Sequence, residues 1–469
     1  MTTTGTNKTT MTNTQHLHAQ TPSTRGTARL TRRGLGSAAT AAAVAPVVGA
    51  ALAACTSGGA GAGQTKQLSG VVHVWAHSLF PFHEDVGGEI ARSLTAKYPN
   101  LTVQSEPLTG NAYEKLTAAV AAGDPPEISN GEPSDVQTLG VNGVVISLDD
   151  YFKRSREVKR EDIWPSIMTD VTYKGKPYGI NYAPDLRVLY VNAGTYRAAG
   201  LDPNKPPATW DELERAVGTV RRGGQGGDIE HLGFDPFLGS GGVYRWLVPY
   251  WQLGGELLSA DETKVTLNNE KAVQGLTWLK KVIDGQGSYE KMQAFEKGST
   301  YQQLFMDNKV THLYATFAER AQVFQKQAPN LQYGFATYPL PPGGRRANYG
   351  SGWAFTISKG ARNPDGAWAF LEHFMVDENN LKFADRYDRI PMRASTTKSE
   401  RYHRNDPFRK LAIDEMPGRR SVICAPGASE ALPFQGQFVT NIMLGKLSIR
   451  EGLQTAEQQI QQALDKFKR

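Results

Sequence analysis

The sequence predicts an α/β fold with mostly parallel sheets, and two observations support this. First, an apolar stretch over 71–76 precedes a segment over 86–98 with apolar residues every four positions, and a second apolar stretch follows over 101–104. This is the order strand, helix, strand, and strands joined by a helix pair in parallel. Second, helix-start signals recur along the chain, as is typical of the α/β class.

The first of these helix-start signals is Asn111 with Glu114, which has the spacing of a capping box, and Gly123 and Pro125 end the predicted helix. A third strand is predicted over 127–130. An Asn, Thr or Ser side chain at such a helix start accepts hydrogen bonds from the free N–H groups of the first helical turn. The same signals recur at Thr209 with Glu212, at Asn363 with Pro364, and at Ser448 with Glu451.

Three stretches rich in Pro or Gly interrupt this pattern, at 174–177, 339–346 and 416–433. If each marks a crossing between two lobes, neither lobe is made of one continuous segment. No internal repeat is evident in the sequence.

The net charge of +6 suggests at first a nucleic-acid or membrane-surface partner. However, residues 1–55 contain five basic and no acidic residues, so 47 basic and 46 acidic residues remain in the rest of the chain. The body is therefore almost neutral, which argues against a nucleic-acid partner. A hydrophobic content of 39% and a charged content of 21% exclude disorder throughout the chain.

The first 55 residues resemble an export signal. Arg32 and Arg33 precede an uncharged stretch over 37–54 that ends at Cys55, which is the layout of a secretory signal peptide. The arginine pair favours twin-arginine export, with the general secretory route as the alternative. The segment 52–55 resembles a bacterial lipobox, in which the Cys55 sulfur is acylated and becomes the new N-terminus. Two or three acyl chains anchor a protein stably.

A transmembrane helix is the alternative interpretation of this stretch. Ala and Gly carry little transfer energy, and residues 56–66 form a flexible Gly-rich linker rather than a charged flank, so a lipid anchor is favoured. Only Cys424 remains after Cys55, so the body has no intrachain disulfide.

Six short motifs occur in an order and spacing typical of one protein family. They lie at 72–75, 97–103, Asp185 with 189–192, 199–203, 209–213 and 350–359. On these motifs, the chain from about Ser69 to Leu464 resembles an extracellular solute-binding protein of a bacterial ABC importer, of the maltose-binding-like class (family 1).

The resemblance implies a two-lobed periplasmic-binding-protein fold of type II, with three hinge crossings and the ligand held between the lobes. The implied divisions are 1–55 for the export signal, 56–66 for the linker, 67–182 plus 345–415 for lobe one, 186–338 plus 430–469 for lobe two, and hinges near 183–185, 339–344 and 416–429.

A neutral sugar needs flat aromatic platforms together with carboxylates and amides. Trp75, His77 and Ser78 follow the first strand at its carboxyl end, where open α/β sheets bind ligands, although Trp75 also fits a core position. Glu132 follows the third strand where the family often places a ligand carboxylate. An ordinary acid at a helix start is the alternative for Glu132.

The family resemblance assigns further ligand-binding candidates in the first hinge and in lobe two. Asp185 matches the family's recurrent binding Asp, and Tyr182 lies three positions before it in the first hinge. Tyr244 matches a stacking aromatic, with Trp246 as its neighbour. Phe317 stands where relatives often carry Trp, which weakens any inference of one particular sugar.

The last candidates follow the second crossing. Gly352 allows close approach of the backbone to a ligand, and Trp353 is the favoured stacking platform, with core packing as the alternative. Arg393 resembles a family arginine that forks onto vicinal hydroxyls or an anion.

The expected function is capture of a sugar or oligosaccharide by a monomer, anchored to the outer face of the cell membrane through Cys55, with delivery to permease subunits that have separate ATPase subunits. No cofactor, metal site or enzyme activity is expected. A binder of glycerol phosphate, using Arg393 or Arg345 with Arg346, is the alternative. A lipid-anchored glycosidase that pairs Asp185 with Glu132 is less favoured.

Overall fold

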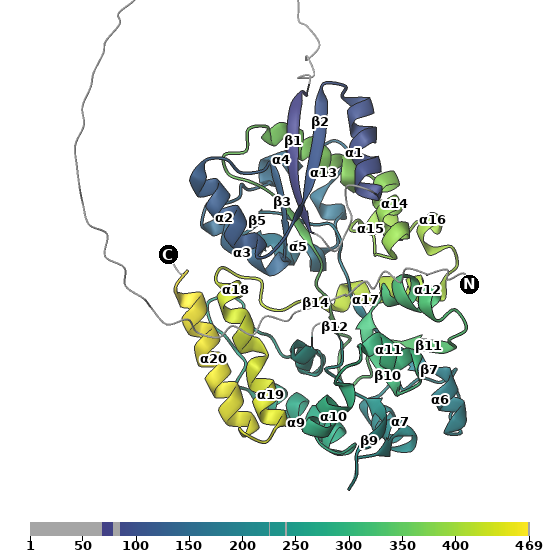
Figure 1. Cartoon of the computed structure of the whole chain (residues 1–469). Helices are drawn as coiled ribbons and strands as arrows, with labels where there is room; N and C mark the ends of the chain where they lie inside the picture. Colours follow the sequence, from purple (N-terminus) through teal and green to yellow (C-terminus); the bar gives the residue numbers. More distant parts are fainter. Residues whose placement is uncertain (1–67, 78–84, 225, 240–241, 468–469) are drawn as a thin grey trace, which may run out of the picture. The chain divides into compact units, whose positions relative to one another are not determined.

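Two five-stranded sheets organise the part of the chain that the computed structural model describes, which is residues 68–77, 85–224, 226–239 and 242–467. Both sheets belong to the compact unit that contains the described residues (Figure 1). One hydrophobic cluster contains buried residues of both sheets.

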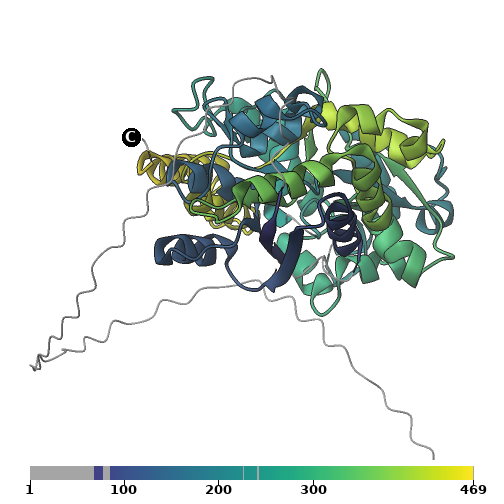
Figure 2. The ribbon, with the colours of Figure 1, turned by 90° about the horizontal axis from the view of Figure 1, so that it is seen from above.

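The first sheet has the strand order β2-β1-β3-β13-β6. The strands are β1 (Gly70–His77), β2 (Leu101–Leu108), β3 (Ile128–Gly131), β6 (Ile180–Asn181) and β13 (Ala354–Ile357). Strand β1 pairs in parallel with β2 and β3, and helix α1 (Val86–Lys97) joins β1 to β2, so the predicted strand–helix–strand unit is confirmed. Figure 2 shows α1 beside the first strands.

The second sheet has the order β11-β7-β10-β9-β8. The strands are β7 (Arg187–Asn192), β8 (Arg222–Gly223), β9 (Ile229–Phe234), β10 (Val310–Thr316) and β11 (Tyr333–Ala336). Only the β9–β10 pairing is parallel among the described strands of this sheet, and β13 is antiparallel to β3 and β6 in the first. The expectation of mostly parallel sheets is therefore wrong. Strand β7 follows β6 directly in the chain, but the two strands belong to different sheets. The crossover helix that parallel neighbours require is therefore not present between them.

The predicted helix starts are confirmed. Thr209 and Glu212 form a reciprocal capping box at α7 (Trp210–Val220), as do Ser448 and Glu451 at α20 (Ile449–Asp465). The Asn side chains at 111 and 363 accept N-terminal N–H groups of α2 (Ala112–Ala122) and α13 (Pro364–Met375). Other helices used below are α3 (Pro133–Val141), α5 (Pro165–Val171), α8 (Leu247–Gln252), α9 (Glu270–Asp284), α14 (Asp377–Tyr387) and α17 (Pro407–Glu415).

Three segments that are distant in sequence lie side by side between the sheets. The Asn348 side chain accepts from the Arg187 N–H (2.9 Å) and donates to the Arg187 carbonyl (2.6 Å). Strand β12 (Asn348–Tyr349) pairs in parallel with β14 (Arg419–Arg420). The start of β7, the strand before β13 and the strand after α17 are thus held in one hydrogen-bonded group.

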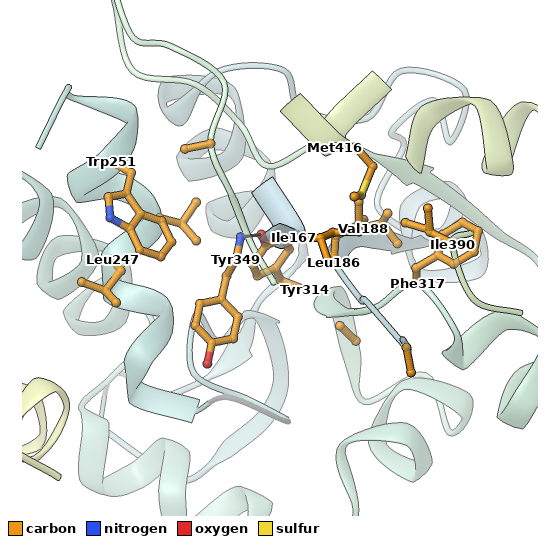
Figure 3. Packing of buried hydrophobic residues seen from close by; sticks show 14 of the residues in the cluster. Ile167, Leu186, Val188, Leu247, Trp251, Tyr314, Phe317, Tyr349, Ile390 and Met416 are labelled. Atoms are coloured by element: carbon orange, nitrogen blue, oxygen red, sulfur yellow. Dashed lines mark hydrogen bonds between the residues drawn. The ribbon is translucent and has the colours of Figure 1, made fainter. Parts of the chain in front are cut away.

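Apolar side chains fill the space around these three segments (Figure 3). Contributions come from α5, β7, α8 and β10, so this part of the core does not belong to one sheet alone. The residues labelled there are Ile167, Leu186, Val188, Leu247, Trp251, Tyr314, Phe317, Tyr349, Ile390 and Met416. Within the described ranges, no helix is both long and apolar enough to cross a membrane.

Candidate functional site

Asp185 lies between the two sheets, in the segment that joins β6 to β7. Its Oδ1 accepts hydrogen bonds from the Ser351 N–H (2.7 Å) and Arg187 Nη1 (3.0 Å), and its Oδ2 is 3.8 Å from Arg389 Nη1. Burial alone would raise the pKa of Asp185, but the two guanidinium groups and the Ser351 N–H hold that pKa below its usual value. Asp185 is thus an ionised carboxylate that orients two arginines.

Glu132 follows β3 and occupies the N-cap position of α3, but its side chain makes no capping hydrogen bond. The carboxyl group makes no hydrogen bond or ion pair with any residue in the described ranges, and the residue is exposed. Desolvation nevertheless raises its pKa to about 7, Asp135 and Asp185 add to this rise, and Arg187 opposes it. Glu132 therefore offers free acceptor oxygens in partly desolvated surroundings, which is what a ligand hydroxyl can use.

Tyrosines and further charged groups of the second sheet's side continue the site. The Arg187 guanidinium lies over the Tyr349 ring at 4.5 Å from its centroid. Tyr301 donates to Glu319 at 2.5 Å, and Arg245 is buried with its Nη1 2.5 Å from the Leu238 carbonyl. Arg187 interacts electrostatically with Asp185, Tyr301 and Tyr349, so these groups share one region around Asp185.

Gly352 serves the contact between chain segments. Its φ of +150° lies in the region that favours glycine, and a Cβ there would collide with the Asn181 side chain and lie 2.8 Å from the Ala183 carbonyl oxygen. The close approach it allows is to the segment before β7. Trp353, the next residue, is half-buried against the core, and its carbonyl accepts from the Tyr182 N–H (2.9 Å).

Trp75 lies in β1 of the first sheet, and Tyr182 directly follows β6 of the same sheet. Tyr182 is fully buried, stacks on Phe355 with 3.9 Å between ring centroids, and accepts from Asn130 Nδ2 at 2.7 Å. The half-buried Trp75 points its Nε1–H at Glu106 on the neighbouring strand. His77 ends β1, and Ser78 lies outside the described residues.

The candidates of the second sheet's side differ in burial. Trp246 is fully buried and donates to the Gln435 carbonyl at 2.8 Å, which is a core arrangement. Phe317 is buried and stacks on Phe408 with 4.5 Å between centroids. Tyr244 is half-buried, so its ring remains partly accessible to a ligand.

The arginines suggested for an anion are committed to carboxylates. Arg393 binds Asp162 (2.7 Å) and Asp377 (3.1 Å). Two others, Arg345 and Arg346, pair with Glu256 (2.5 Å) and Glu415 (3.6 Å). The structure therefore brings Glu132 and Asp185 into one region, whereas these three arginines form ion pairs with other carboxylates. The predicted Cys55, Arg32 and Arg33 functions lie outside the described residues.

Sequence reasoning did not identify Arg187, Arg389 and Arg419. The sequence contains a signal for two of them. Arg187 is a charged residue at the start of an otherwise apolar strand, and Arg389 lies four positions before the candidate Arg393. Arg419 had no such local signal. Among the described residues, no group of three or more His, Cys, Asp and Glu side chains is arranged to hold a metal ion.

Comparison with known proteins shows which sequences this chain resembles. The family model described as bacterial extracellular solute-binding protein matches residues 89–409. A binding protein of Brucella abortus is 25% identical over 359 residues, which cover 76% of this chain and 84% of the relative.

Two solved structures resemble this chain over most of its length. The protein CpMnBP1 with mannotriose bound is 24% identical, with a TM-score of 0.69 over 83% of this chain and 99% of that chain. A cyclic α-maltosyl-1,6-maltose binding protein from Arthrobacter globiformis is 20% identical, with a TM-score of 0.71 over 85% of this chain and 100% of that chain. This likeness confirms the two-lobed type II fold that the sequence motifs implied.

Proposed function

Because the chain belongs to the family of bacterial extracellular solute-binding proteins, we propose that it captures a sugar or oligosaccharide and delivers it to the permease of an ABC importer. The two similar solved proteins are described with mannotriose and with a cyclic maltosyl-maltose, which supports a saccharide as the solute class. The sequence contains no Gly-rich phosphate loop with Lys, so ATP hydrolysis belongs to separate subunits in this proposal.

The observation that carries the proposal is the free carboxyl group of Glu132 close to Asp185. Glu132 has acceptor oxygens without a protein donor, and Asp185 holds Arg187 and Arg389 next to it. A saccharide offers hydroxyls that donate to the carboxyl and accept from guanidinium groups, and apolar faces that stack on half-buried rings such as Trp353.

The proposed mechanism is a change in the lobe equilibrium. We divide the lobes at 183–185, 339–344 and 416–429 and expect a saccharide to favour the closed arrangement of the monomer. The hydrogen-bonded group around Asn348 joins the start of β7 to β12 and β14, so it offers a pivot that stays intact during this change.

Calorimetric titration with mannotriose, a linear maltose-series oligosaccharide and glycerol 3-phosphate tests the proposal. We expect saturable one-to-one binding of at least one saccharide, a saturable change in tryptophan fluorescence, and unchanged sugar by chromatography after prolonged incubation. Binding of glycerol phosphate alone would favour the alternative solute, and cleavage of the sugar would favour a glycosidase. Trehalose- and xylose-based oligosaccharides extend the panel in a thermal-shift screen, since a ligand of the folded state raises the melting temperature.

We also propose that the protein is tethered outside the cytoplasm through a lipid on Cys55, after twin-arginine or general export directed by Arg32 and Arg33. Replacing Cys55 with Ala is expected to move the protein from the membrane fraction to the soluble extracytoplasmic fraction, because the sulfur that carries the acyl chains is lost. Fractionation with immunoblotting checks this. The matched control is Cys424→Ala, which should stay with the membrane, and retention of the Cys55 variant there would refute the anchor.

A further inference from the structure

The short helix α18 (Ala428–Ala431) follows the third crossing and is fixed to α20. Glu430 of α18 forms an ion pair at 2.6 Å with Lys466, which directly follows α20. Gly427 is the N-cap residue of α18 and has a φ of +88°, and a Cβ there would lie only 3.0 Å from the Ala463 carbonyl oxygen of α20. Glycine at this position therefore allows α18 and α20 to pack closely.

Helix α20 belongs to lobe two. Its Gln461 side chain accepts from the Val265 N–H at 2.8 Å. Its Glu457 carboxylate accepts from the Asn268 N–H, also at 2.8 Å. Both donors lie shortly before α9, inside lobe two as divided above. Figure 1 shows α18 between α20 and α3, a helix of lobe one, so α18 is a part of lobe two that meets lobe one.

Two hydrogen bonds connect α18 to α3, and we call this pair of bonds the α3–α18 clasp. The Ser429 hydroxyl donates to the Asp135 carboxylate. The Gly427 N–H donates to Thr138 Oγ1 at 3.1 Å, and Thr138 is 2% exposed, so this second bond is buried. Asp135 and Thr138 lie three positions apart and therefore share one face of α3. The clasp thus joins lobe one to lobe two along one face of one helix.

The clasp lies at the end of α3 that carries Glu132. Asp135 is three positions after Glu132, and both residues line one small pocket between α2, α3 and β3. Glu132 also interacts electrostatically with Asp185, between the two sheets. Asp135 is half-buried; burial raises its pKa, and the hydrogen bond from Ser429 opposes that rise. A movement of the lobes that brings α18 to Asp135 therefore also brings lobe two towards Glu132.

We propose, resting on the saccharide-binding function and the lobe division above, that the α3–α18 clasp belongs to the closed, solute-holding arrangement of the lobes. Asp135 and Ser429 are then positioning residues that raise the affinity for every saccharide the protein holds, without touching it. Closure exchanges water around the Asp135 carboxylate for the Ser429 hydroxyl. Because a ligand of the closed state binds more tightly when that state is more populated, the clasp contributes directly to affinity.

Ser429→Ala tests the clasp, by calorimetry with mannotriose or the linear maltose-series oligosaccharide, whichever binds the wild-type protein. The affinity is expected to fall about ten-fold, because closure then buries the Asp135 carboxylate without its donor. Stopped-flow tryptophan fluorescence should assign this loss to faster dissociation, since the clasp forms after the solute has entered. Ser429→Thr, which keeps a hydroxyl, should recover most of the affinity.

Two further variants separate the clasp from other effects of changing α18. In an Asp135→Asn background, Ser429→Ala is expected to cost only about three-fold in affinity or less, because a neutral amide without a donor is less costly to bury than a carboxylate. Glu430→Gln is the matched control. It changes the neighbour of Ser429, whose ion-pair partner Lys466 belongs to lobe two as well, so it should keep the wild-type dissociation constant.

An unchanged or tighter dissociation constant in Ser429→Ala would overturn the role of the clasp in closure and leave the saccharide function standing. If Ser429→Ala does not fold, Thr138→Val decides the question in the same way, because it removes the acceptor of the Gly427 N–H while keeping the shape of the side chain. Binding of no saccharide by the wild-type protein would instead overturn the saccharide function itself.

Discussion

Replacing Arg419 with Met is expected to lower the free energy of unfolding by about 3–5 kcal/mol, because it leaves the Asp170 carboxylate buried without its ion-pair partner. The Arg419 side chain is 0% exposed, and Asp170 is 3% exposed. Arg419 donates to Asp170 Oδ2 (2.8 Å), to the Ser166 carbonyl (2.7 Å) and to the Asp185 carbonyl (3.0 Å), and also bonds the Ser351 carbonyl. Denaturant unfolding followed by circular dichroism measures the effect.

The adjacent Arg420 provides a matched control. Its guanidinium pairs with the half-exposed Glu256, and an exposed pair of this kind contributes at most about 1 kcal/mol. Arg420→Met should therefore be nearly neutral. If Arg419→Met is too unstable to purify, the double variant with Asp170→Leu should recover much of the loss, since neither charge of this ion pair then remains buried. Similar small effects for Arg419→Met and Arg420→Met would show that Arg419 does not hold the three segments together.

Trp353→Ala is expected to weaken saccharide binding more than ten-fold, which corresponds to about 1.5 kcal/mol or more for the loss of a stacking platform. The ring is half-buried and lies directly before β13, close in sequence to Ser351, whose N–H contacts Asp185. Calorimetry with the best ligand of the panel measures the change.

A variant of a core tryptophan is the control that distinguishes the loss of stacking on the ligand from a general loss of stability. Trp278, in α9, is buried and stacks on Trp210 with 4.1 Å between centroids. Trp278→Phe should lower the melting temperature but leave the dissociation constant unchanged. An unchanged dissociation constant in Trp353→Ala would remove Trp353 from the site.

The sequence predicts those parts of the fold that depend on neighbours in the chain. The capping box of Thr209 with Glu212 and the parallel pairing of β1 with β2 follow from local spacing, and both are confirmed. The direction of β7 does not follow from such spacing. Strand β7 enters its sheet from the other sheet, and only the complete topology shows that it is antiparallel to β10.

The same limit applies to the candidate site. Glu132 and Asp185 were assigned through the family resemblance, which implies a ligand carboxylate after the third strand and a binding Asp before the strand that contains 189–192. Arg419 was missed because its partner Ser166 is 253 residues away in sequence. Arg393 was proposed for the ligand because nothing local reveals its pairing with Asp162, which lies 231 residues earlier.

A crystal structure with the tightest ligand of the panel tests the central claim most directly. The account predicts the solute within hydrogen-bond distance of Glu132 and Arg389, with one face against Trp353. A solute that binds instead in the separate surface pocket of about 460 Å³ lined by residues such as Arg197, Asn308 and Gln332, with the region around Asp185 empty, would contradict it.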